Sequence, residues 1–114
     1  MLQRKFRLPS FVRFTHAHAI TTPFFSIKFC KNGLPISRFG FIVSKKVDKR
    51  AVVRNRVKRQ VRHAVEQMLL EIMQGYDILF ILRRSCIQQD TSVISQEVKK
   101  TLVRNGLVIS QNKV

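Results

Sequence analysis

Nine lysine and arginine side chains lie between residues 45 and 62, and only one acid, Asp48, accompanies them. Three of the cations, Arg54, Lys58 and Arg62, recur every four residues, which places them on one side of a helix. Guanidinium and ammonium groups bind phosphate oxygens, and arginine does so in bidentate fashion through its planar fork. The spacing and residue types therefore indicate a rigid surface that binds a polyanion.

An apolar stripe runs along the same segment and defines the helix that positions these cations. Val53, Val57 and Val61 also recur every four residues, about 100° around the helix from the cationic series. Ala64, Val65, Met68 and Ile72 continue the stripe at helical spacing. The pattern predicts one amphipathic helix over about residues 51–74, ended by Gly75, with the valines buried.

A solvated helix face is the alternative reading of the cations. Such faces mix charges of both signs and gain from Glu–Lys pairs four residues apart, but no such acid occurs before Glu66. Asn55 could contact the polyanion, orient an arginine or cap a backbone group. The basic loop at 45–50 precedes the helix N-terminus, so it is a second phosphate-binding candidate, with a merely solubilising loop as the alternative. The predicted polyanion-binding residues are Lys45, Lys46, Lys49, Arg50, Arg54, Asn55, Arg56, Lys58, Arg59 and Arg62.

The composition of the whole chain agrees with a polyanionic partner. The 114 residues fit one domain, and their net charge of +16 points to nucleic acid or an anionic membrane. No segment approaches the roughly 20 apolar residues of a membrane helix, and no secretory signal is recognisable, so we expect a cytoplasmic protein. In that compartment Cys30 and Cys86 are expected to remain thiols.

The remaining elements follow from periodicity and turn residues. Residues 1–8 are expected to be a flexible basic segment, and Ser10 could cap a short helix that contains Phe11 and Phe14. Strands are predicted at 24–30 and 36–44, joined as a hairpin by an Asn-Gly turn at 31–35, because that pair supplies positive φ. The second of these strands reads as too apolar for a sheet edge. A strand covered on both faces is predicted at 76–82, and a helix from Asp90 or Thr91 to Asn105.

Two of these segments together resemble the protein subunit of bacterial ribonuclease P. The run RFGFIVSKK at 38–46 matches the family strand R-x-G-x-x-x-S-K-K, and residues 54–62 match its helix R-N-R-x-K-R-x-x-R. The strand at 76–82 follows in the family's order. The resemblance implies a single α+β domain at 9–108 in the order α-β-β-α-β-α, with a four-stranded sheet, a left-handed βαβ crossover and a flexible tail at 109–114.

The resemblance also implies a function. The family's protein binds a catalytic RNA and the single-stranded 5′ leader of precursor tRNA, and the RNA removes the leader with bound Mg²⁺. The implied leader cleft has Phe11 and Phe14 in the first helix and, in the first strand, Phe29 or Lys28; we favour Phe29. Phenylalanine stacks on unpaired bases but is more often core, and core is our interpretation of Phe25. The implied partners are the RNA subunit and precursor tRNA, with no protein partner and no membrane.

No catalytic constellation appears in the sequence. The six acids include no pair at metal-binding spacing, whereas a protein-only nuclease would need several carboxylates for two metal ions. His16 and His18 alone make a poor zinc site. We therefore expect no metal or cofactor on the protein. A ribosomal or other structural RNA-binding protein and a protein-only nuclease remain the alternatives to a ribonuclease P subunit.

Overall fold

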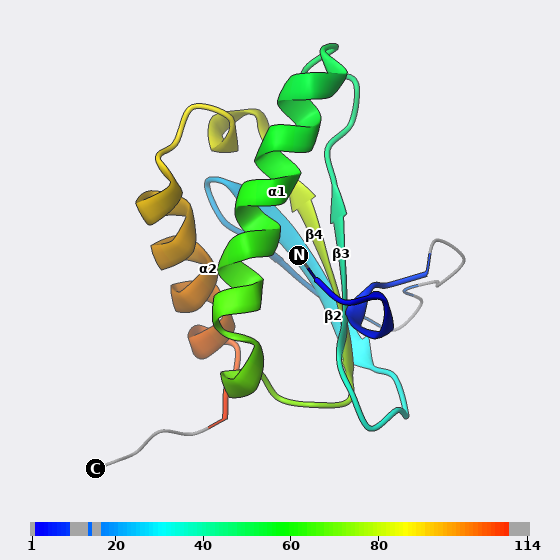
Figure 1. Ribbon diagram of the computed structural model, residues 1–114. Coiled ribbons are helices and arrows are strands. Elements are labelled where there is room, and N and C mark those ends of the chain that lie inside the picture. The colour runs from blue at the N-terminus through cyan, green and yellow to red at the C-terminus, as the bar shows by residue number, and fades with distance from the viewer. Residues whose placement is uncertain (1, 10–13, 15–16, 110–114) are drawn as a thin grey trace.

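The computed structural model describes residues 2–9, 14 and 17–109, and it consists of one mixed sheet with two helices on one of its faces (Figure 1). The predicted helical turn after Ser10 lies outside the described residues, apart from Phe14. In chain order the elements are η1 (Arg4–Phe6), β1 (His18–Thr21), β2 (Phe25–Lys31), β3 (Arg38–Ile42), α1 (Ala51–Gln67), η2 (Leu69–Glu71), β4 (Tyr76–Leu82), η3 (Arg84–Cys86) and α2 (Thr91–Arg104), where η denotes a short 3-10 turn.

The sheet has the strand order β1-β2-β4-β3, which corrects the predicted hairpin. β2 and β3 do run in opposite directions, and Gly33 in their connection has the positive φ that the Asn-Gly pair suggested. They do not pair, however, because β4 lies between them, antiparallel to β2 and parallel to β3. β3 is therefore an edge strand, contrary to the sequence interpretation. β1, which pairs antiparallel with β2, was not assigned from the sequence.

The connection from β3 through α1 to β4 has the left-handed sense that the family resemblance implied. In Figure 1 both strands run upward, α1 lies in front of them, and β4 lies to the left of β3. Right-handed connections dominate among parallel strands, so general rules would have predicted the opposite hand. This connection brings the cationic helix back across the sheet, beside β3.

The core lies between the sheet and the two helices. Alternate residues of the central strands face the helices, and the three valines of the α1 stripe face the sheet. The buried strand residues are Phe25, Ile27, Phe29, Ile78, Phe80 and Leu82, and the three valines are buried too. Phe25 and Phe80 pack edge to face with ring centroids 5.4 Å apart. The opposite face of β4, with Leu79 and Ile81, is only half-buried, so the strand is not covered equally on both faces.

α1 ends at Gln67, seven residues before the predicted end. The chain tightens into η2 and then turns extended, and Ile72 forms an isolated bridge with Val108. Ile72 is 1% exposed, so it reaches the core as the stripe predicted, but from an extended backbone rather than a helical one. The amide of Ile109 donates to the carbonyl of Glu71 at 2.7 Å, which ties the end of the described chain to this turn. No helix within the described residues is long and apolar enough to span a membrane.

Residues 2–8, which the sequence suggested to be loose, pack along the outer edge of β3. Leu2 is 2% exposed and belongs to the core. Arg7 forms a parallel bridge with Phe39, and the amide of Leu8 donates to the Phe39 carbonyl at 2.8 Å. Gly40 leaves room for this segment, because a Cβ there would lie 3.1 Å from the Leu8 side chain. The segment therefore covers part of an edge strand that would otherwise offer free backbone groups.

A buried ion pair holds the β2–β3 connection against β4. The carboxylate of Asp77, which is 3% exposed, accepts hydrogen bonds from Arg38 Nε at 2.9 Å and Nη2 at 2.8 Å. It also accepts from Asn32 Nδ2 at 2.9 Å. The pairing raises the pKa of Arg38 above its usual value. Residues from both ends of the connection thus converge on the strand that separates β2 from β3.

Candidate nucleic-acid interface

The cations of α1 occupy two sides of the helix, on either side of its buried valines. Arg54, Lys58 and Arg62 are half-buried, and Lys58 and Arg62 line a hollow beside β3. Arg56 and Arg59 are exposed and line a hollow on the side nearer α2, which Arg62 also reaches. Asn55 is exposed beside them. The structure therefore brings the predicted α1 residues onto one helix, but it divides them between two surroundings.

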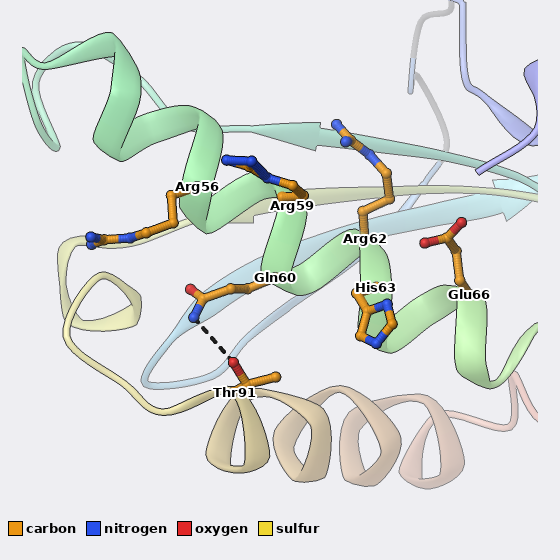
Figure 2. Close-up of a pocket in the computed structure, with 7 residues that line it drawn as sticks. All are labelled: Arg56, Arg59, Gln60, Arg62, His63, Glu66 and Thr91. Carbon is orange, nitrogen blue, oxygen red and sulfur yellow. Dashed lines mark hydrogen bonds between the residues drawn. The ribbon is translucent and has the colours of Figure 1, made fainter. Parts of the chain in front are cut away.

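The side nearer α2 forms a hollow of about 430 Å³, shown in Figure 2. Gln60 and His63 point towards α2, and Gln60 Nε2 donates to the Thr91 hydroxyl at 3.3 Å. Cations outnumber the acid, Glu66, in this lining, so the hollow suits an anion. The lining residues are Arg56, Arg59, Gln60, Arg62, His63, Glu66 and Thr91.

Two arginine side chains outside the loop at 45–50 hold it in place by donating hydrogen bonds to its backbone carbonyls. Arg54 Nη1 donates to the carbonyls of Asp48 at 3.0 Å and Lys49 at 2.8 Å. From the other side, Arg84 of η3 donates through Nη2 to the Lys46 carbonyl at 2.9 Å. A loop tied on both sides presents Lys45, Lys46 and Lys49 from a defined backbone, which a merely solubilising loop would not require.

Asp48, the acid in this loop, is paired with Arg50. Arg50 donates to the carboxylate through Nε at 3.0 Å and Nη2 at 2.9 Å, and its backbone amide donates at 2.9 Å. The Arg50 hydrogen bonds lower the pKa of Asp48 to about 2. Asp48 therefore stays ionised down to strongly acidic pH, and it compensates the charge of Arg50 but not that of the three exposed lysines.

The aromatic residues proposed for the leader cleft have different positions. Phe29 lies on the helix-facing side of β2, is 7% exposed and packs in the core. Its ring stacks on His18, with centroids 5.2 Å apart, and little of it remains open to a nucleic-acid base. Lys28, the other alignment choice, is exposed on the opposite face of the sheet. Phe14 is half-buried, and Phe11 lies outside the described residues. Phe25 is fully buried, as predicted.

Within residues 2–9, 14 and 17–109, no three histidine, cysteine or acidic side chains come together as a metal site. Cys30 and Cys86 are both free thiols. Burial raises the pKa of Cys86 to about 11, so this thiol is a core residue rather than a nucleophile. The described side chains thus offer cation-lined surfaces and no cluster of carboxylates.

Sequence reasoning did not find two arginines that contribute to these surfaces. Arg84 reaches the 45–50 loop only because η3 follows β4 to the same end of the sheet, and no local pattern signals that contact. Arg7 falls in the segment that the sequence suggests to be loose. In the structure its neighbour Leu8 packs against Gly40 of β3, and Arg7 itself lies beside Lys58 and Arg62 of α1. The available signal was the alternation of charged and apolar side chains at 5–8.

A small mixed sheet carrying one strongly cationic helix defines a basic, single-domain α+β protein. The chain belongs to the ribonuclease P protein family, whose model, described as "Ribonuclease P", matches residues 5–106. It is thus a protein component of the tRNA-processing ribonuclease P holoenzyme, as the resemblance of residues 38–46 and 54–62 had indicated.

Individual relatives agree with this family membership. The chain is 39% identical over 79 residues to the "Ribonuclease P protein component" of Microcystis aeruginosa, covering 69% of this chain and 66% of the relative. It is 31% identical over 94 residues to that of Caldanaerobacter subterraneus, with 82% and 80% covered. The solved structure of the ribonuclease P protein from Staphylococcus aureus superposes with a TM-score of 0.76 at 25% identity, covering 99% of both chains.

Proposed function

We propose that this chain binds the RNA subunit of ribonuclease P through α1 and the 45–50 loop, and that it holds the 5′ leader of precursor tRNA on the opposite face of its sheet. The observation that carries the first part is the concentration of cations on α1 and its preceding loop. Between residues 45 and 62 the only acid is Asp48, which is already paired with Arg50. Uncompensated cations fixed on folded backbone repel one another until phosphates neutralise them.

The leader is assigned to the sheet face turned away from the helices. Alternation along the strands puts Ser26, Lys28 and Cys30 on this face, next to Leu79 and Ile81 of β4. The face combines one exposed cation with half-buried apolar side chains, which suits a single strand held by backbone charge and base contact. Because Phe29 faces the core, Lys28 takes its place as the strand residue of the proposed cleft.

The chemistry is assigned to the RNA subunit and its Mg²⁺. Two-metal hydrolysis requires several convergent carboxylates when a protein performs it, and the described residues contain no such cluster. The protein then contributes by neutralising phosphates and by positioning the leader. We infer no metal or cofactor bound by the protein itself.

Reconstitution tests this assignment. The purified chain is incubated with precursor tRNA in the presence and absence of a ribonuclease P RNA subunit, and 5′ cleavage is followed. We expect cleavage at low Mg²⁺ only when both are present. Cleavage by the protein alone would instead support a protein nuclease, and a chain that neither cleaves nor stimulates the RNA would fit a structural RNA-binding protein.

A double variant tests the role of α1. In Arg56→Ala/Arg59→Ala two exposed cations are removed, and the fold is expected to persist because neither residue is in the core. If both contact phosphate, the log–log salt dependence of RNA-subunit binding should flatten by about two units. The matched control is Lys99→Ala/Lys100→Ala, which removes the same charge from exposed positions of α2. An equal change in both variants would mean that only net charge matters.

A further inference from the structure

A second hollow lies between the N-terminal segment, β3 and α1, on the side of the helix away from α2. Its volume is about 380 Å³, and three cations from distant parts of the chain meet there: Arg7, Lys58 and Arg62. The rest of the lining is apolar or glycine, and none of the lining residues is acidic. These are Leu2, Leu8, Phe39, Gly40 and Phe41.

Each cation is placed by contacts that leave charged groups available. The backbone of Arg7 is fixed by its bridge to Phe39, and its Nε donates to the Leu2 carbonyl at 3.0 Å, so the two Nη groups remain for another acceptor. The Arg62 guanidinium lies over the Phe41 ring, 5.8 Å from its centroid. Lys58 is half-buried one helical turn before Arg62.

This arrangement is unfavourable without an anion. Like charges that converge in a partly enclosed space repel more strongly than on open surface, because the apolar walls reduce the screening by water. The same walls strengthen the attraction of an anion that enters. The hollow is also far larger than the roughly 30 Å³ of one water molecule, so it admits a tetrahedral oxyanion with part of its hydration.

We propose that Arg7, Lys58 and Arg62 form a binding site for one phosphate group, and that an RNA backbone phosphate occupies it in the holoenzyme. The identity of the occupant rests on the proposed function, whereas the chemical class follows from the lining. The site makes the N-terminal segment part of the RNA-binding surface. It also gives the cations of α1 two different roles. Arg54 donates hydrogen bonds to the 45–50 loop, whereas Lys58 and Arg62 line this hollow and bind the phosphate.

The test compares two neighbouring arginines. Arg7 lines the hollow, whereas Arg4, three residues earlier in η1, is exposed and does not. In Arg7→Ala the log–log salt slope of RNA-subunit binding should fall by about one unit, which is roughly a fourfold smaller loss of affinity between 50 and 200 mM salt. Arg4→Ala should keep the wild-type slope, and so should Arg7→Lys, which retains the charge. Equal slopes for Arg7→Ala and Arg4→Ala would overturn the proposal.

A second measurement uses the free protein and inorganic phosphate as the probe. Side-chain NMR resonances of Arg7, Lys58 and Arg62 should shift together, with one midpoint, as phosphate is added at constant ionic strength. The common midpoint should be lost in Arg7→Ala, with circular dichroism confirming that the variant is folded. Absence of shifts at these three residues in the wild type would refute the site. Failure of the RNA subunit to bind the wild type, with the phosphate shifts intact, would refute the proposed function instead.

Discussion

Val57→Asp is expected to leave the domain unfolded. Val57 is fully buried at the centre of the α1 stripe, where it packs between the sheet and the helices. An aspartate there has no partner among the surrounding apolar side chains, and burying a charge without a partner costs more than the roughly 5–15 kcal/mol that stabilises a typical domain. The far-UV circular dichroism spectrum should lose its helical signal, and urea should produce no cooperative transition.

The matched control is Val52→Asp in the first turn of the same helix. Val52 is 73% exposed, so the new carboxylate stays hydrated. An acid in the first turn also interacts favourably with the helix dipole. The variant should therefore unfold cooperatively, at a urea midpoint near that of the wild type. A folded Val57→Asp protein, or an equal loss in both variants, would show that the helix faces are assigned wrongly.

Asp77→Ala is expected to destabilise the protein by about 3 kcal/mol, because removing one partner leaves the other charge of a buried pair uncompensated. The substitution removes the acceptor of three hydrogen bonds that hold the β2–β3 connection, of which Arg38 donates two and Asn32 donates one. The Arg38 side chain keeps 20% exposure, so partial hydration limits the loss. Urea denaturation measures the difference in the free energy of unfolding.

Asp90→Ala is the control for this second change. Asp90 is exposed before α2 and makes no side-chain capping hydrogen bond, so its loss should cost less than about 1 kcal/mol. Arg38→Ala in the Asp77→Ala background completes a double-mutant cycle. The second substitution should then add little, since its partner is already absent. A full additional loss would mean that Arg38 stabilises the fold through contacts other than Asp77.

Local patterns predicted the elements well and their pairing poorly. The continuous apolar run at 76–82 and the helix ended by Gly106 appear as β4 and α2 within a residue of expectation. The Asn32-Gly33 pair predicted a chain reversal, which occurs. A turn specifies a reversal but not a neighbour, and the pairing of β2 with β4 depends on contacts about fifty residues apart in sequence. The hand of the crossover came from the family resemblance and not from periodicity.

The candidate site shows the same division between local and distant information. Residue type and spacing identified the cations of α1 and the buried valines, because both depend on helical geometry alone. The bracing of the 45–50 loop by Arg84 depends on where η3 ends, and no local signal encodes that. Phe29 is favoured over Lys28 for the cleft because it shares a face with Phe25 and Ile27. That shared alternation already indicated the core, where all three residues lie.

The central place of β4 has a consequence for how the chain acquires its structure. When β2, β3 and α1 have been synthesised, the position between the two strands is still empty, and neither strand can complete its hydrogen bonding. Only after residue 82 can β4 enter that position and join both strands, so the sheet forms from contacts distant in sequence. Folding of this kind is slow compared with that of helical bundles, since loop closure precedes the gain from pairing. During that interval the basic segment 45–62 is already exposed, and its mutual repulsion opposes collapse until counterions or RNA phosphates gather around it.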